Sequence, residues 1–246
     1  MRPDYYKDYY FNELGPAFTR YVETFDSRSG GTVALYNAAM EAAGKLFHLR
    51  EAINESTGIE RSRKDIGDLC WSYQLIGDVF NSSKHVKINR GDRLINGRKD
   101  VHTIVCCSIV PYENNPSDWY FYSDFRVIVH PIKSDPIDLL KLAAEVLRFW
   151  GWYLYKENLL EQVLQYEYKG DEPLSPELAT QKIDVHLVDN KPEGVGEMTM
   201  VYRLWDLEKK DWVPFTGQVA LEKDGVPIQP AHVSRPPKSA RKRWGL

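Results

Sequence analysis

The spacing of apolar residues constrains the fold of this chain more than any other feature, because it changes once along the sequence. Up to about residue 168, apolar side chains recur at three- and four-residue steps, which is the period of an α-helix that buries one face. Beyond residue 176 they recur at every second position, the period of a half-buried β-strand. This change of period predicts an α+β fold, with helices in the first part and strands in the last.

Four helices are predicted in the first part of the chain, over residues 16–25, 32–57, 65–85 and 136–159. Pro16 suits the first turn of the first helix, and Thr32 is a candidate N-cap for the second. The third helix is expected to bury one face and to present on the other face Asp68, Gln74, Asp78 and Asn81. Several amphipathic helices of this kind are typical of a helical bundle.

Two strand-like runs, residues 102–111 and 119–130, are joined by a polar loop and predict a β-hairpin inserted into the bundle. A polar segment with two prolines, residues 169–176, marks the best domain boundary. The alternating runs beyond it predict a small antiparallel sheet of about four strands. We therefore expect a helical bundle with an inserted hairpin over residues 1–168, a small antiparallel β domain over residues 169–232, and a flexible basic tail over residues 233–246.

Composition limits the class of protein. A net charge of −3 argues against indiscriminate coating of nucleic acid. Cys70, Cys106 and Cys107 form neither a C-x-x-C pair nor a disulfide framework, which fits a reducing cytoplasm, and the adjacent pair is expected in the core. The sequence shows neither a signal-peptide pattern nor an apolar run of membrane-spanning length. We therefore expect a cytoplasmic protein that does not associate with a membrane.

One candidate site lies at the end of the third predicted helix. Asn81 and His85 are four residues apart, so their side chains should share one helix face, with Asp78 within reach of positioning His85. A histidine near its reference pKa transfers protons at neutral pH, and an asparagine can orient a phosphodiester or a hydroxyl. Nearby cations could neutralise phosphate charge: Lys84, Lys87, Arg90 and Arg93.

These residues resemble the R-N-x-x-x-H motif of the HEPN superfamily. The match reads Phe80-Asn81-Ser82-Ser83-Lys84-His85, with Phe80 in the place of the motif's arginine. The resemblance covers at most residues 5–168. It implies a dimeric helical bundle with the motif at the dimer interface, often within a prokaryotic antiviral defence or toxin–antitoxin system. Because the arginine is missing, we expect a non-catalytic protein that binds partner subunits or RNA.

Three alternatives stay open. A metal-independent ribonuclease would use His85 as general acid or base, Asn81 to orient the substrate, and Lys84 with Arg90 to hold phosphate. A scaffold would instead dock through its aromatic N-terminal segment and its basic tail. In the third alternative Asn81, Lys84 and His85 are only a polar helix end, because cations there complement the negative end of the helix dipole.

Other residues carry weaker indications. The basic tail, with Arg241, Lys242 and Arg243, could dock on nucleic acid or on an acidic protein. His102 and His130 flank the predicted hairpin, but no histidine pair shows the sequence spacing of metal ligands. A glycine-rich phosphate loop and a G-x-S-x-G nucleophile turn are both missing from the sequence. We therefore expect no metal and no cofactor.

Overall fold

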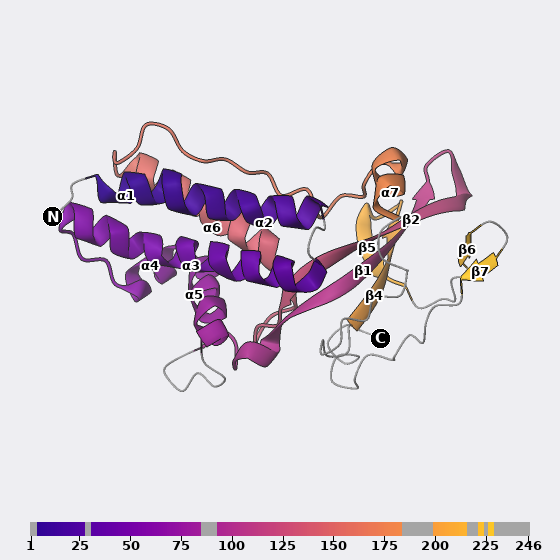
Figure 1. Cartoon of the computed structure of the whole chain (residues 1–246), viewed down its shortest axis with the longest axis horizontal. Helices are drawn as coiled ribbons and strands as arrows, with labels where there is room; N and C mark the ends of the chain where they lie inside the picture. The colour runs from indigo at the N-terminus through magenta and orange to yellow at the C-terminus, as the bar shows by residue number, and fades with distance from the viewer. Residues whose placement is uncertain are drawn as a thin grey trace. The chain divides into compact units, whose positions relative to one another are not determined.

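The computed structural model describes residues 4–27, 31–84, 93–183, 199–215, 221–223 and 226–228 (Figure 1). Helices and a sheet occur together, which confirms the predicted α+β class. The chain divides into two compact units. The first comprises Met1–Thr103 and Phe125–Lys169, and the second comprises Ile104–Asp124 and Gly170–Leu246.

The first unit is built around helices, whose bounds are α1 (Tyr5–Asp8), the π-helical turn η1 (Tyr9–Leu14), α2 (Gly15–Ser27), α3 (Gly31–Thr57), α4 (Arg63–Leu69), α5 (Trp71–Lys84) and α6 (Leu139–Lys156). Helix α3 is central, because α2, α5 and α6 all pack against it (Figure 1). Trp150 is fully buried in this core, and its indole N–H donates to the carbonyl of Leu46 at 2.9 Å. The one polar group of this large side chain is therefore satisfied inside the bundle.

The π-helical turn before α2 has a local cause at Pro16. A proline inside a helix lacks the N–H that would bond four residues back, and its ring collides with the carbonyl of that residue, here Asn12. The chain widens instead, and the N–H of Gly15 reaches back five residues to the carbonyl of Tyr10. The start of the first helix is therefore wider than a regular α-helix, and α1, η1 and α2 follow one another without a break.

The third predicted helix is divided in two. Ser62 caps α4, with its hydroxyl accepting from the N–H of Asp65 at 3.1 Å and its own N–H donating to the Asp65 carboxylate at 2.7 Å. The helix then stops at Cys70, whose backbone is extended (φ −147°, ψ 99°), and α5 begins at the next residue. The prediction of one continuous helix to His85 is therefore wrong at Cys70, and His85 itself lies outside the described residues.

The sheet runs in the order β3-β2-β1-β4-β5, and its strands are β1 (Val101–Tyr112), β2 (Asn115–Val129), β3 (Ile137–Asp138), β4 (Thr199–Asp206) and β5 (Asp211–Pro214). A short 3₁₀ turn, η2 (Arg98–Asp100), precedes β1. Strand β4 pairs parallel with β1, from Ile104 opposite Thr199 to Ile109 opposite Leu204. The predicted hairpin is therefore extended by later strands, with β4 parallel to β1 and β5 antiparallel to β4 in the same sheet. The part of the hairpin from Ile104 to Asp124 belongs to the second unit.

The second unit also contains a helix that the periodicity missed, α7 (Pro176–Ile183). Ala179 from this helix is buried against Val110 and Tyr122, in a small core of its own. The two short strands β6 (Leu221–Lys223) and β7 (Val226–Ile228) form a separate antiparallel pair. Ile183 ends α7. Residues 184–198 and the predicted tail over 233–246 lie outside the described residues.

Cys106 and Cys107 are both buried and form no disulfide, which confirms that they are core residues. Among the helices of the described ranges, none combines the length and the apolar character needed to cross a bilayer.

Candidate functional site

The predicted site begins at the last turn of α5. Asn81 is half-buried there, and its side chain forms no hydrogen bond with another described residue. Lys84 ends the helix, and Arg93 is described and half-buried. The side chain of Lys84 lies outside the described part of the structure. So do all the remaining candidates, which are His85, Lys87, Arg90, Arg241, Lys242 and Arg243. The pairing of Asn81 with His85 therefore stays a prediction.

Asp78, which we expected on the exposed face beside His85, is buried, with 3% of its surface accessible. One carboxylate oxygen accepts from the guanidinium of Arg63 at 2.8 Å, and the other accepts from the backbone N–H of Leu94 at 2.9 Å. The expectation of an exposed Asp78 is therefore wrong. A carboxylate out of water needs such partners, and here they join α5 to the start of α4 and to the segment before β1.

Phe80, in the place of the HEPN motif's arginine, faces helix α3. A Cβ atom added to Gly44 would lie 2.6 Å from Cε2 of Phe80, so only glycine at position 44 admits the ring at this distance. The ring also meets His48 edge-on, with ring centroids 5.1 Å apart. Position 80 is therefore occupied by a packed aromatic side chain and supplies no cation beside Asn81.

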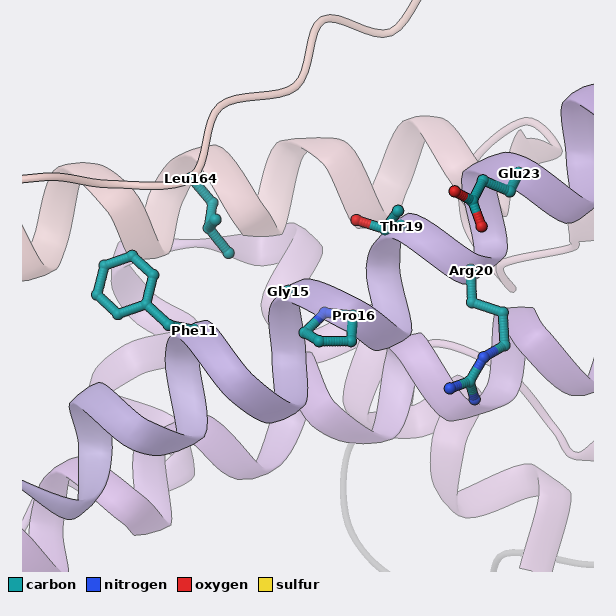
Figure 2. A pocket seen from close by; sticks show the side chains of 7 residues that line it. All are labelled: Phe11, Gly15, Pro16, Thr19, Arg20, Glu23 and Leu164. Carbon is teal, nitrogen blue, oxygen red and sulfur yellow. The ribbon is translucent and has the colours of Figure 1, made fainter.

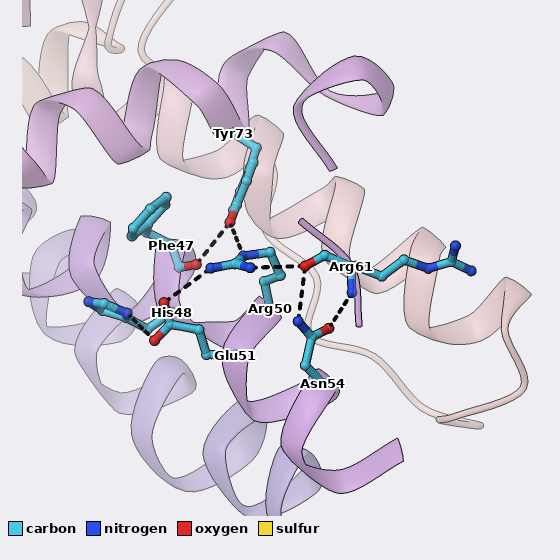
Figure 3. A network of polar contacts seen from close by, with 7 residues as sticks. All are labelled: Phe47, His48, Arg50, Glu51, Asn54, Arg61 and Tyr73. Carbon is cyan, nitrogen blue, oxygen red and sulfur yellow. Dashed lines mark hydrogen bonds and ion pairs between the residues drawn. The ribbon is translucent and has the colours of Figure 1, made fainter. Parts of the chain in front are cut away.

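A polar network surrounds Arg50 on α3 (Figure 3). Its guanidinium donates to the hydroxyl of Tyr73 at 3.2 Å, to the carbonyl of Arg61 at 2.9 Å and to the carboxylate of Glu51 at 3.1 Å. Burial raises the pKa of Tyr73 to about 12, although the charge of Arg50 opposes this shift. Asn54 adds two hydrogen bonds to the backbone of Arg61, at 2.9 and 3.1 Å. This network fixes the loop between α3 and α4 to the helices.

His48 is a candidate that the sequence did not single out. Its Nδ1 lies 2.8 Å from a carboxylate oxygen of Glu51, which in turn is bound by Arg50 (Figure 3). A carboxylate that holds Nδ1 fixes the orientation of the imidazole ring. The signal in the sequence was a histidine three residues before a glutamate in a helix, a spacing common on solvated faces.

A shallow groove of about 550 Å³ runs along the outer face of α2 (Figure 2). Its walls combine apolar side chains with a few polar ones, and its lining residues are Phe11, Gly15, Pro16, Thr19, Arg20, Glu23 and Leu164. Arg20 turns toward α3, where it donates to Glu41 at 2.6 Å. The groove therefore has an apolar end at Phe11 and Leu164 and a carboxylate, that of Glu23, at the other end.

His102 and His130, far apart in the sequence, lie side by side in the first unit. Their rings are stacked with centroids 4.7 Å apart, and their Nε2 atoms are separated by 3.3 Å. Burial lowers the pKa of His102, while its hydrogen bond to the backbone of Lys99 works in the opposite direction. No group of three or more potential metal ligands occurs among the residues that the structure describes.

Helix α6 exposes aromatic side chains near its end. We call Phe149, Trp152 and Tyr155 the aromatic face of α6: they follow at three-residue steps, and Trp152 and Tyr155 are 48% and 64% exposed. The ammonium of Lys156 lies 4.8 Å from the centroid of the Trp152 ring. Exposed large aromatic residues at helical spacing are a feature of surfaces that contact other proteins.

Comparison of the chain with protein-family models, with curated proteins and with solved structures finds no match. The HEPN resemblance therefore rests on the segment from Phe80 to His85 and on the helical character of the first unit.

Proposed function

We propose that the protein is a non-catalytic, HEPN-like binding protein of the cytoplasm, which acts by associating with protein partners and first of all with a second copy of itself. The observation that carries this proposal is the aromatic face of α6, where Trp152 and Tyr155 expose about half or more of their surface. Tryptophan and tyrosine dominate the energetic centres of protein interfaces, because they bury a large area with few rotatable bonds. None of the three cysteines forms a disulfide, which is compatible with a reducing compartment.

The absence of catalysis is supported by position 80. Cleavage of RNA without a metal ion needs a fixed cation beside the phosphate, because negative charge develops there in the transition state. Phe80 occupies that position and packs against Gly44 and His48. Asp78 is engaged by Arg63 and Leu94, so both its oxygens already have partners. These contacts favour a structural role for the middle of α5.

A protein partner is favoured over RNA by charge. Over residues 4–27 and 31–84, acidic side chains outnumber basic ones, whereas contact with a phosphate backbone requires clustered cations. Most of the basic residues expected to hold RNA, Lys87, Arg90 and the tail, lie outside the described residues. Binding of RNA by these residues stays a separate prediction.

A second copy is the partner we propose first, for two reasons. The HEPN resemblance implies a dimer, and one exposed patch is sufficient for a twofold interface because both copies use the same surface. The hydroxyl of Ser72 also donates to Glu145 at 2.7 Å, so the start of α5 is bound to α6 one turn before Phe149. Leu69 and Trp71, close to Ser72 in the sequence, are exposed large apolar residues as well.

Sedimentation of the full chain over a wide concentration range tests the proposal. We expect a concentration-dependent dimer for the unmodified protein and a monomer for the double variant Trp152→Glu with Tyr155→Glu. Val33 is 56% exposed on α3, so Val33→Glu is a matched control that should leave the dimer intact. A wild-type protein that stays monomeric at every concentration would contradict the proposed self-association.

The catalytic alternative is tested with single-stranded and hairpin RNA. We expect both substrates to remain intact with the wild-type protein in the presence of a metal chelator. Cleavage that is abolished by His85→Ala in a protein with an unchanged melting temperature would instead establish the ribonuclease alternative.

A further inference from the structure

The chain after α6 runs back along the outer face of the first unit, next to α2 (Figure 1). Leu164 lies against Gly15, with its Cδ1 3.3 Å from the position that a Cβ on Gly15 would take. Two residues later, the ring of Tyr166 meets Phe18 edge-on at 5.1 Å between centroids. We call residues 161–168 the strap.

The strap has the side-chain pattern of a β-strand. Over residues 164–168 the side chains alternate: Leu164, Tyr166 and Tyr168 are half-buried, whereas Gln165 and Glu167 are exposed. Val163 is half-buried too, and residues 161 and 162 form a bend before it. The alternation indicates that the backbone of residues 164–168 is extended and shows one face to the helices. Each strand of the sheet pairs with at least one neighbour, but the strap belongs to no strand ladder in the described part of the chain.

The main chain of the strap is almost without hydrogen bonds. The N–H of Leu164 donates to the hydroxyl of Tyr10 at 3.0 Å. Apart from this group, no main-chain N–H or C=O of residues 161–167 bonds to another described residue. An extended segment in this state presents a row of donors and acceptors, which is the feature that lets a sheet edge accept a further strand.

The groove along α2 lies directly beside the strap, and Leu164 belongs to both (Figure 2). Phe11, Pro16 and Leu164 make one end apolar, and the Glu23 carboxylate marks the other. Arg20 is drawn away by its ion pair with Glu41, so it does not neutralise Glu23. Glu23 is eight residues beyond Gly15 on α2, a distance of about 12 Å at 1.5 Å per residue.

We propose that the strap and this groove bind an extended peptide segment of a partner protein. The peptide adds to the strap as a β-strand, through main-chain hydrogen bonds with residues 163–167, beyond the bend at residues 161 and 162. One large apolar side chain of the peptide enters the groove between Phe11, Pro16 and Leu164. A lysine or arginine four positions earlier reaches Glu23, because four residues of a strand span about 13 Å and keep both side chains on one face.

The direction of the peptide follows from the relative stability of parallel and antiparallel pairing. The strap and α2 run the same way, since Leu164 meets Gly15 and Tyr166 meets Phe18. Antiparallel pairing is somewhat more stable than parallel pairing. The peptide therefore enters with its basic residue at the Glu23 end and its apolar residue later, at the Phe11 end. The strap and the groove share no residue with the aromatic face of α6, so the inference does not depend on self-association.

The test uses a fluorescein-labelled nonapeptide with blocked ends, in which threonine and valine alternate and a lysine precedes a leucine by four positions. We expect saturable binding to the full chain by fluorescence anisotropy, and slower hydrogen exchange of alternate amides within residues 163–167 when the peptide is bound. Two control peptides should bind at least tenfold more weakly: one with N-methyl groups on the amides that face the strap, and one with glutamate in place of lysine.

Protein variants separate the main-chain contact from side-chain effects. Gln165→Pro removes a main-chain N–H that has no partner among the described residues, whereas Gln165→Ala keeps it. We expect at least a tenfold loss of peptide affinity for Gln165→Pro and no change for Gln165→Ala. Glu23→Lys should also lose tenfold or more, whereas Glu60→Lys, at another exposed position, should not.

Three results would overturn the inference: no saturable binding of the peptide, equal binding of the N-methylated peptide, or binding that leaves the exchange of the strap amides unchanged. If Gln165→Pro lowers the melting temperature, the peptide affinity of Glu23→Lys alone tests the inference, and an unchanged affinity of that variant would overturn it. Binding that survives Trp152→Glu with Tyr155→Glu would show that this surface works whether or not the chain forms a dimer.

Discussion

The guanidinium of Arg63 donates to the carboxylate of Asp78 over 2.8 Å, and this contact joins the first residue of α4 to the middle of α5. Arg63 also donates to the carbonyl of Gln74 at 2.9 Å and lies over the ring of Phe47 at 5.4 Å. Because α4 and α5 are separated by a break at Cys70, these contacts set the position of one helix against the other.

Asp78→Ala should lower the free energy of unfolding by about 1–3 kcal/mol, because the N–H of Leu94 and the guanidinium of Arg63 lose their shared acceptor. Urea denaturation followed by circular dichroism measures the change. Asp68→Ala, at an exposed position nearby, should stay within about 0.5 kcal/mol of the unmodified protein. Equal effects of the two substitutions would show that the buried carboxylate contributes no stability.

Gly44→Ala should destabilise the protein, although helix propensity alone predicts a gain of about 1 kcal/mol. The new Cβ would lie 2.6 Å from the ring of Phe80, and such overpacking typically costs about 1–3 kcal/mol. In a Phe80→Ala background the same change should become neutral or stabilising. A double-mutant cycle measures this coupling, and purely additive effects would contradict the contact.

Tyr10→Phe should free the strap from the helix formed by α1, η1 and α2, because the Tyr10 hydroxyl accepts the N–H of Leu164 at 3.0 Å. The expected loss of stability is about 1 kcal/mol, together with faster hydrogen exchange at the Leu164 amide. Tyr5→Phe, close in sequence, serves as the control. Unchanged exchange at Leu164 in Tyr10→Phe would mean that this bond does not hold the strap.

Acid should weaken the first unit through His102. Burial lowers the pKa of His102 below its ordinary value of 6.5 in the folded chain. At a pH between 6.5 and the lower pKa of His102 in the folded chain, the unfolded chain binds more protons than the folded chain. The contribution of His102 to the free energy of unfolding is therefore fully present above about pH 6.5, and it is lost as the pH falls through this range. Melting temperatures from about pH 7.5 to about pH 5 should fall less steeply for His102→Gln than for the unmodified protein. Parallel curves would rule out this contribution.

Local sequence patterns were sufficient to predict those helices whose apolar spacing or capping residues lie close together in the sequence. Helix α3 follows its apolar stripe because Leu35, Leu46 and Ile53 all face one core. The start of α7 also had a readable signal, since Ser175 before Pro176 is a typical cap followed by a first-turn proline. This pair of residues predicts a helix start within the polar segment over residues 169–176.

Pairings between distant segments could not be predicted in this way. The parallel pairing of β4 with β1 joins Thr199 to Ile104, and no local pattern specifies such a partner. Asp78 looked exposed because its partner Arg63 lies fifteen residues earlier, beyond the helix face that periodicity describes. At the candidate site, the sequence correctly placed Asn81 in the last turn of a helix, whereas the role of Phe80 depends on Gly44 from another helix.

The fit between Gly44 and Phe80 makes two positions on different helices interdependent. A Cβ at position 44 would lie 2.6 Å from the ring of Phe80, so any larger residue there requires a smaller side chain at position 80. A redesign of this part of α5 therefore has to choose residues 44 and 80 together.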